Sequence, residues 1–303
     1  MKKNLSLKIK KKAIAILTIT TILSTMVLTG CGKTSDESSS SSTVSTYTGP
    51  VTEIKIGIGN AFNPFCYLDE NGKETGYDYE VIKAVDDLLP QYKFTYEATE
   101  FVNILVGLDS KKYDIAIHHY GWNATRAAKY LYAKVCDFPG SGYVIAAKPG
   151  RTFKTEADLQ GLSVEVAVSS NAAFLLETYN KTLSSDKQVK LVYDGATSEQ
   201  IWSNILAGVY DAYIPDEFAF DQTNKAYGNT LTKYGTNVLQ TVAGAGTDVG
   251  TYFIYNFGSE ELQTAVDTAL QTLIDDGTIA KISVKSLGKD YVTDGFNKIK
   301  AKK

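Results

Sequence analysis

The sequence predicts an α/β protein of two lobes, between which the chain crosses twice. Strand and helix patterns alternate from about residue 51, a second set of such units begins near Gly142, and one strand with a long helix is left over. This alternation favours parallel sheets covered by helices on both faces. We therefore expect lobe 1 at 51–140, lobe 2 at 141–242, and a return to lobe 1 with C-terminal helices at 243–303.

Lobe 1 begins with the strand EIKIGIG at Glu53. Asp78 is placed to cap the helix that follows, whose apolar side chains form one stripe of Val81, Ile82, Val85, Leu88 and Leu89. The strand KFTYEA comes next, then a helix with Ile104, Leu105 and Leu108 inward, and then the strand YDIAIHH. This order predicts the first sheet.

Lobe 2 repeats the scheme with strands in SGYVIAAK, LSVEVAVSS and VKLVYD. Ser198 is predicted to begin a helix whose inward side chains are Ile201, Ile205, Leu206 and Val209. The pair Gly107 and Asp114 echoes the pair Gly208 and Asp211. In each pair, we interpret the glycine as a helix C-cap and the aspartate as the start of the next strand.

The remaining unit is the strand TYFIYN followed by a long helix that ends at Gly277. Its predicted inward stripe is Leu262, Val266, Leu270, Leu273 and Ile274. Ligands of open α/β sheets bind outside the carboxyl ends of the strands. We therefore expect the binding site in a cleft between the lobes.

Residues 1–30 resemble a bacterial export signal. They hold six lysines and no acidic residue, and the apolar run from Ala13 to Leu28 is shorter than the roughly 20 residues of a membrane-spanning helix. The run ends in Leu28-Thr29-Gly30-Cys31, which resembles the lipobox of lipoproteins. We expect cleavage after residue 30 and acyl chains such as palmitate on Cys31, which would anchor the protein at the extracytoplasmic face of the cell membrane. An uncleaved signal anchor is the alternative.

The segment at 31–50 is rich in serine and threonine and predicts a flexible tether. The full chain has 31 basic and 34 acidic residues. Removal of the six N-terminal lysines would leave 25 basic residues against 34 acidic ones, a net charge of −9. This balance argues against a nucleic-acid partner.

Reactive chemistry has few candidates in this sequence. His118 and His119 are the two histidines, and neighbours on a strand point to opposite faces, so they cannot share a metal ion. No motif of a metalloprotease, P-loop or nucleophile elbow occurs. We expect no enzyme activity, metal or cofactor. Cys66 and Cys136 could form a disulfide in an oxidising exterior or remain two buried thiols.

Several segments, read in order, resemble the amino-acid-binding proteins of ABC importers, which are periplasmic-binding proteins of type II. They are NAFNPFCYLDENGKETGYDYEVIKAV, EFVNILVGLDSKKYDIAIHHYGWNATRAAKYLYA, LQGLSVEVAVSSNAAFLLE, ILAGVYDAYIPDEFAF and LQTLIDDGTIAKI. The resemblance implies a periplasmic-binding-protein-like fold with two hinge crossings. It also implies a monomer that captures an L-amino acid and delivers it to an ABC permease by hinge closure.

The resemblance assigns two charged residues to the ligand. Arg126 matches the arginine that binds the α-carboxylate, which a guanidinium can grip with two parallel hydrogen bonds. Asp216 matches the aspartate that binds the α-ammonium group. The alternatives are an exposed helix arginine and an aspartate that caps a turn beside Pro215.

Aromatic and small polar residues complete the implied site. Phe62 and Phe101 match aromatic positions that flank the ligand side chain, with core packing as the alternative. Ser169, Ser170 and Asn171 match a polar loop at a helix start, where backbone N–H groups favour an anionic group. Plain N-capping is the alternative reading of this loop.

The chain departs from the family pattern just before the arginine. His119, Gly121 and Asn123 stand where hydroxyl residues are common, so backbone groups at His119 and Gly121 would have to serve. The form Asn-x-x-Arg at 123–126 resembles the branch associated with cystine, although Ala124 and Thr125 replace its Pro-Glu. Two other functions stay open at this point: a dehydratase-like enzyme on the same scaffold, and a sensory or adhesin lipoprotein.

Overall fold

The computed structural model describes residues 47–140, 142–235, 237–246 and 250–302, which belong to one structural unit. The predicted signal peptide, the lipid site at Cys31 and nearly all of the tether lie outside the described residues. Within the described ranges, no helix is long and apolar enough to cross a membrane.

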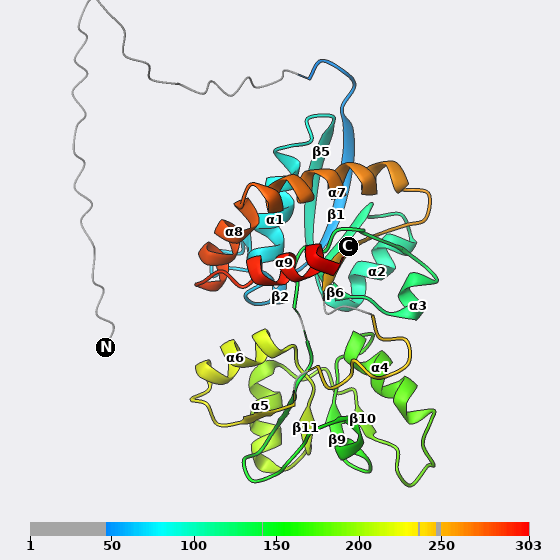
Figure 1. Cartoon of the computed structure of the whole chain (residues 1–303), viewed down its shortest axis with the longest axis vertical. Helices are drawn as coiled ribbons and strands as arrows, with labels where there is room; N and C mark the ends of the chain where they lie inside the picture. The colour runs from blue at the N-terminus through cyan, green and yellow to red at the C-terminus, as the bar shows by residue number, and fades with distance from the viewer. Residues whose placement is uncertain (1–46, 141, 236, 247–249, 303) are drawn as a thin grey trace, which may run out of the picture. The chain divides into compact units, whose positions relative to one another are not determined.

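The described chain forms two five-stranded sheets and one small sheet (Figure 1). The first sheet has the order β5 (Tyr92–Thr99), β1 (Thr52–Gly59), β6 (Ile115–Gly121), β13 (Thr251–Tyr255), β7 (Leu131–Tyr132). The second has the order β10 (Lys190–Val192), β9 (Ser163–Glu165), β11 (Ala212–Tyr213), β8 (Ile145–Ala147), β12 (Thr232–Tyr234). The small sheet joins β2 (Ala61–Phe62), β3 (Cys66–Leu68) and β4 (Glu74–Thr75). We call the parts built on the first and second sheets lobe 1 and lobe 2.

The sheets are mixed, whereas the sequence predicted parallel ones. Strands β5, β1 and β6 pair in parallel, and so do β10, β9 and β11. Strands β13, β7, β8 and β12 pair antiparallel to their neighbours. The antiparallel strands β7, β8, β12 and β13 are those on either side of the two crossings, where the chain leaves one sheet and enters the other.

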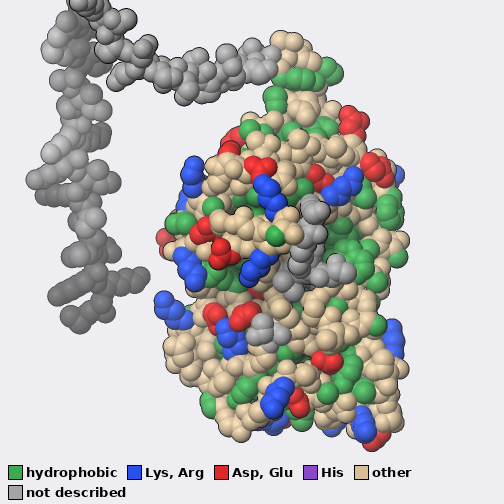
Figure 2. Space-filling model, viewed as in Figure 1, with side chains coloured by type: hydrophobic (Ala, Val, Ile, Leu, Met, Phe, Trp, Pro, Cys, Tyr) green, Lys and Arg blue, Asp and Glu red, His purple; other side chains and the backbone are tan. Residues whose placement is uncertain are grey.

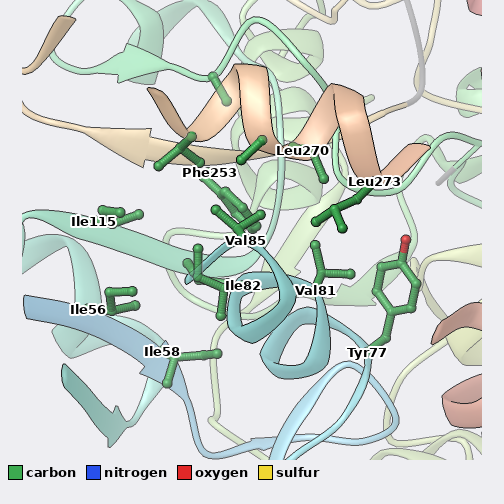
Figure 3. Packing of buried hydrophobic residues seen from close by; sticks show 14 of the residues in the cluster. Ile56, Ile58, Tyr77, Val81, Ile82, Val85, Ile115, Phe253, Leu270 and Leu273 are labelled. Carbon is green, nitrogen blue, oxygen red and sulfur yellow. The ribbon is translucent and has the colours of Figure 1, made fainter. Parts of the chain in front are cut away.

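Helices flank both sheets. In lobe 1 they are α1 (Tyr77–Asp86), α2 (Phe101–Asp109), α3 (Ala124–Ala127), α7 (Glu260–Asp275), α8 (Thr278–Leu287) and α9 (Thr293–Lys302). In lobe 2 they are the 3₁₀ helix η1 (Glu156–Leu159), α4 (Asn171–Asn180), α5 (Ser198–Ala207) and α6 (Glu217–Ala226). Figure 3 shows how Ile82 of α1 and Leu270 of α7 pack with Ile56 and Phe253 of the sheet, and all four are fully buried or nearly so. The predicted α7 stripe is confirmed, with Ile274 partly buried at its edge.

The chain passes between the lobes twice, after β7 and again before β13. The two crossing segments lie side by side, because the Asp137 N–H donates to the Thr251 carbonyl at 3.0 Å and the Thr251 N–H to the Phe138 carbonyl at 2.9 Å. Ala245 still packs against the apolar cluster of lobe 2. The boundary at residue 243 stays a prediction.

Four local predictions were wrong. Leu88, predicted in the inward stripe of the first helix, lies beyond the end of α1 and is exposed. Asp78 does not cap α1, because Gly76 holds the N-cap position and Asp78 is fully buried in the first turn. Leu206 and Val209 are exposed, and Trp202 takes their place in the core of lobe 2. Gly107 is not a C-cap: it lies inside α2, where a Cβ atom would come within 2.2 Å of the Tyr113 ring.

The predicted similarity between the lobes is confirmed for Asp114 and Asp211, each of which directly precedes a strand. Asp114 accepts a hydrogen bond from the N–H of Lys55 in β1 at 2.8 Å, and Asp211 accepts one from the N–H of Ser163 in β9 at 2.9 Å. Gly208 caps α5 in the left-handed region, as predicted. In each lobe, an aspartate carboxylate therefore accepts a hydrogen bond from the backbone of the neighbouring strand.

Candidate functional site

Arg126 lies where the two lobes meet. Asn123 caps α3 by accepting the Arg126 N–H at 2.8 Å, and the Arg126 side chain is largely buried, with 7% of the residue exposed. Its Nη1 donates to the Gly121 carbonyl at 3.1 Å, and its Nη2 donates to the Ser169 carbonyl of lobe 2 at 2.7 Å. The guanidinium thus bridges the lobes through neutral oxygens.

The buried charge of Arg126 has no anionic partner in the described part of the chain, where it forms no ion pair. The Tyr120 ring lies 5.1 Å from its Cζ and adds a cation–π contact. Buried charges are normally paired, because desolvation without a counter-ion is costly. A carboxylate is therefore the group that this position would gain most from binding.

A second contact joins the lobes beside Arg126. The Nδ2 of Asn123 donates to Oδ1 of Asn171 at 3.0 Å. Gly121 permits this approach, since a Cβ atom there would lie 3.0 Å from Nδ2 of Asn171. The cavity lined by Gly121, Trp122 and Asn171 measures about 30 Å³, which is room for one or two water molecules and not for an amino acid.

The predicted polar loop lies at the start of α4. Ser170 is the N-cap of α4, and its hydroxyl accepts the Ala173 N–H at 3.1 Å. For Ser170, the alternative of plain N-capping is therefore confirmed. Ser169 has a left-handed φ of 61° and contributes its carbonyl to Arg126. Of the three predicted residues, Ser169 and Asn171 contact lobe 1.

Asp216 caps α6. Its Oδ1 accepts the N–H groups of Phe218 at 2.9 Å and Ala219 at 3.1 Å. A β-bridge joins Asp216 to Tyr143, a residue that sequence reasoning missed. Burial raises the pKa of Tyr143 to about 12, and both Arg126 and Asp216 act on it electrostatically. Tyr143 therefore lies within the fields of both predicted charges, and no sequence pattern marked it.

The two predicted aromatic residues flank His118. Phe62 stacks on the His118 ring at 5.2 Å between centroids, and the Phe101 ring lies 4.6 Å from it on a tilted plane. Burial lowers the pKa of His118 to about 4, so the ring is neutral at pH 7. Phe101 also contacts Tyr120, the ring beside Arg126. The aromatic residues thus form a continuous group that reaches the guanidinium.

His119 turns its side chain into the interior. Its φ of 52° breaks the strand geometry, and its ring lies 3.8 Å from Phe65 and 5.0 Å from Phe138, centroid to centroid. The side chain is 3% exposed, and Nδ1 lies 3.6 Å from Oδ1 of Asp78. Burial alone would lower the pKa of His119, but the carboxylate of Asp78 outweighs it and the pKa is raised.

Asp137 completes a buried group with Asp78 and His119. One ligand-type atom of each lies within 4.8 Å of the others. Burial and the Asp78 carboxylate raise the pKa of Asp137 to about 7, while His119 acts in the opposite direction. No sequence pattern indicated this group, because its members come from three separate segments.

The cysteines take the second of the two predicted states. Cys66 and Cys136 are both buried, and among the described residues they form no disulfide. Burial raises the pKa of the Cys66 thiol well above its ordinary value, so it stays protonated.

Comparison with known proteins matches residues 54–289 to the family described as bacterial extracellular solute-binding proteins, family 3. The chain is 36% identical over 245 residues to the L-cystine-binding protein TcyJ of Bacillus subtilis (strain 168), which covers 81% of this chain and 87% of that protein.

Solved structures are also similar. A putative L-cystine ABC transporter protein from Listeria monocytogenes superposes with a TM-score of 0.70 at 34% identity, and the match covers 80% of this chain and 98% of that one. A second structure, described for glutathione import via GshT and the cystine importer TcyBC of Streptococcus mutans, gives a TM-score of 0.69 at 29% identity. Its match covers 80% of this chain and 97% of that chain.

Proposed function

The chain belongs to the bacterial extracellular solute-binding proteins of family 3, and on this premise we propose that it captures an L-amino acid between its lobes, with cystine as the first candidate. Cystine is favoured because relatives that match most of the chain are named for it. The Asn-x-x-Arg form at 123–126 points to the same branch.

The observation that carries this proposal is the buried guanidinium of Arg126. It lies at the junction of the lobes, bonded to the carbonyls of Gly121 and Ser169 and to no carboxylate of a described residue. A ligand carboxylate would replace neutral acceptors with a charged, bidentate one, which forms stronger hydrogen bonds. Arg126 is therefore our candidate for the α-carboxylate site.

Asp216 is our candidate for the α-ammonium group. Its capping bonds use the carboxylate oxygen Oδ1. The negative charge of Asp216, at the start of α6 in lobe 2, is what supports this assignment, since an ammonium group is bound by an anion. Tyr143, which lies in the fields of both charges, is a candidate for contact with the ligand backbone.

Ligand entry requires the lobes to separate. The cavity beside Gly121 has a volume of about 30 Å³, and the bond from Arg126 to Ser169 occupies the place where a carboxylate would bind. We propose that the lobes open about the two crossing segments and close again on the ligand. Closure is favoured only by contacts that the ligand lacks in the open form.

Delivery and anchoring complete the proposal. We infer export, a lipid anchor at Cys31, and transfer of the ligand from a monomer to an ABC permease at the extracytoplasmic face of the membrane. The visible face of the molecule carries acidic and basic side chains interspersed, without one large basic patch (Figure 2). Such a surface fits a solute carrier better than a nucleic-acid binder.

A binding role without catalysis fits the position of His119. An imidazole can act as an acid or a base, but the His119 side chain is enclosed by Phe65 and Phe138. A dehydratase-like activity would need such a group in contact with the substrate. Turnover of an aromatic precursor by the purified protein would contradict our proposal. A sensory or adhesin role would be favoured by the lack of permease and ATPase genes beside this one.

Thermal unfolding with added amino acids tests the function directly. At about 100-fold excess over Kd, a ligand adds about 2.7 kcal/mol to the free energy of unfolding and raises the Tm. We expect this shift with L-cystine and none with D-cystine at equal concentration. A shift with glutathione and not with cystine would identify glutathione as the ligand in place of cystine. No shift with any amino acid or glutathione would refute the proposed function.

A further inference from the structure

Asp78, His119 and Asp137 form a buried cluster at the base of the two crossing segments. Asp78 comes from α1, His119 from β6, and Asp137 from the first crossing segment. Asp78 is 0% exposed and Asp137 is 1% exposed, and the His119 side chain is 3% exposed. We call these three residues the hinge cluster. None of them has a part in the proposed contacts with an amino acid through its side chain.

Two members of the hinge cluster have unsatisfied polar atoms. Among the described residues, neither carboxylate oxygen of Asp78 has a hydrogen-bond partner, and neither has Nε2 of His119. The separation of 3.6 Å between Nδ1 of His119 and Oδ1 of Asp78 is longer than a hydrogen bond. The neighbouring Cys66 thiol is only a weak donor and does not satisfy the carboxylate. A fully buried carboxylate without donors is costly, and such a group calls for a bound partner.

The spacing of the donor atoms suits a metal ion. Zinc binds histidine nitrogen and carboxylate oxygen at about 2.0–2.2 Å in tetrahedral geometry, which separates neighbouring ligand atoms by about 3.4 Å. Here Nδ1 of His119 lies 3.6 Å from Oδ1 of Asp78 and 3.5 Å from Oγ1 of Thr251. Oγ1 of Thr251 lies 3.2 Å from Oδ1 of Asp137. These separations leave room for an ion at the centre with little movement.

We propose that Asp78, His119 and Asp137 bind one divalent transition-metal ion such as Zn²⁺, with the Thr251 hydroxyl or a water molecule in the fourth position. Two carboxylates and an imidazole match the oxygen and nitrogen ligands that this ion takes. Two negative charges and one neutral imidazole would balance the charge of the ion. Binding would release protons from the site, because each ligand must be deprotonated.

The location gives the ion a structural consequence. Asp137 lies on the first crossing segment and Thr251 is the first residue of β13, where the second crossing segment ends, and a backbone hydrogen bond of 3.0 Å joins them. An ion shared with Asp78 and His119 would tie both segments to the core of lobe 1. Phe218 of lobe 2 packs on Phe65 and Phe138, the rings that enclose His119. Separation of the lobes would therefore uncover a route for the ion.

Zinc binding by the full chain tests this site. The chain, in a Cys31→Ser background that removes an unrelated thiol ligand, is stripped with a chelator and dialysed to equilibrium against ZnCl₂ at pH 7. Zinc content gives the stoichiometry, and competition with a chelator gives Kd. We expect one ion per chain, and binding weaker by roughly 100-fold or more in Asp78→Asn and in Asp137→Asn. Glu165→Gln is the matched control, because Glu165 is 2% exposed with an unpartnered oxygen but lies in lobe 2. It should bind zinc as wild type does.

Cobalt absorption keeps the test independent of the variants, which could fail to fold. Co²⁺ in a site of nitrogen and oxygen ligands with four-coordinate geometry gives visible bands far stronger than those of the hydrated ion. We expect these bands in the wild-type chain at one equivalent, and their loss when Zn²⁺ is added. The absence of saturable zinc binding, or equal zinc affinity in wild type, Asp78→Asn and Asp137→Asn, would overturn the proposal. In that case, bound protons and not a metal ion neutralise the negative charge of the hinge cluster.

Discussion

Lobe 1 and lobe 2 bring opposite charges to the candidate site and hold them in different ways. In lobe 1, the Arg126 guanidinium donates to two carbonyl oxygens and has no carboxylate partner among the described residues. In lobe 2, the Asp216 carboxylate already accepts two backbone N–H groups at the start of α6. Lobe 2 also buries Glu165, whose Oε2 has no hydrogen-bond partner in the described part of the chain.

Because of this difference, we expect substitutions in the two lobes to affect ligand affinity and the stability of the fold to different extents. A cation that faces only neutral acceptors gains from an incoming anion, so Arg126 should affect chiefly the ligand. A carboxylate that caps a helix also stabilises the fold, so Asp216 should affect both. Oε2 of Glu165 has no hydrogen-bond partner among the described residues, so this buried carboxylate should affect the stability of the fold. Variants at the three positions test this contrast.

The largest expected effect is on ligand affinity at Arg126. Arg126→Ala should weaken binding by about 2–5 kcal/mol, because a buried carboxylate loses its charged partner. Arg126→Lys should lose less ligand affinity than Arg126→Ala, because lysine keeps the positive charge but cannot form the bidentate hydrogen bonds. Isothermal titration with the ligand found by thermal shift measures both. Arg151→Ala, which removes a surface arginine paired with Asp211, is the control. Unchanged affinity in Arg126→Ala would show that the carboxylate binds elsewhere.

Glu165 should make the stability of the fold depend on pH. Burial raises its pKa from 4.5 to about 7, with a smaller contribution from Asp194. The folded state therefore binds the Glu165 proton more tightly than the unfolded state does. The contribution of this proton to the free energy of unfolding is complete below pH 4.5 and is lost as the pH rises through 7. The wild type should lose roughly 3 kcal/mol over this range relative to Glu165→Gln, which cannot ionise.

Urea unfolding at pH 4.5, 6 and 8 measures this difference. Glu53→Gln, at an exposed position of β1, should keep the wild-type dependence on pH. Equal slopes in wild type and Glu165→Gln would mean that the Glu165 carboxylate is solvated.

At Asp216, two variants divide the two roles of the carboxylate. Asn can cap a helix as well as Asp, whereas Asp216→Ala should cost about 1 kcal/mol of stability. Both variants should weaken ligand binding, because both lose the negative charge. Chemical denaturation and titration calorimetry on the pair test this. A full-affinity Asp216→Asn protein would leave the aspartate with its capping role alone.

The smallest effect is expected at the contact between the lobes. Asn171→Ala removes the bond to Asn123 and should favour separated lobes by about 0.5–1.5 kcal/mol. Small-angle X-ray scattering of the ligand-free protein should then give a larger radius of gyration. Gln160→Ala removes a bond to Tyr179 inside lobe 2 and should leave the radius unchanged. A wild-type radius in Asn171→Ala would show that this bond does not hold the lobes together.

The sequence predicted the fold class well because strand and helix periodicity is local. The stripe of α7, the stripe of α1 apart from the exposed Leu88, and the aspartates at 114 and 211 were predicted from spacing alone. Predictions failed where a distant neighbour decides the role of a residue. Gly107 resembles a C-cap in sequence, but it makes room for the Tyr113 ring instead.

The order of motifs along the chain was enough to predict the family and to point to the two candidate charges, Arg126 and Asp216. The folded chain was needed to show that Asp216 caps a helix, that the His119 side chain points inward, and that Asp78 and Asp137 lie beside it. The reason is physical: periodicity and capping patterns record interactions over a few residues. The burial and pairing of charges depend on segments that only folding brings together.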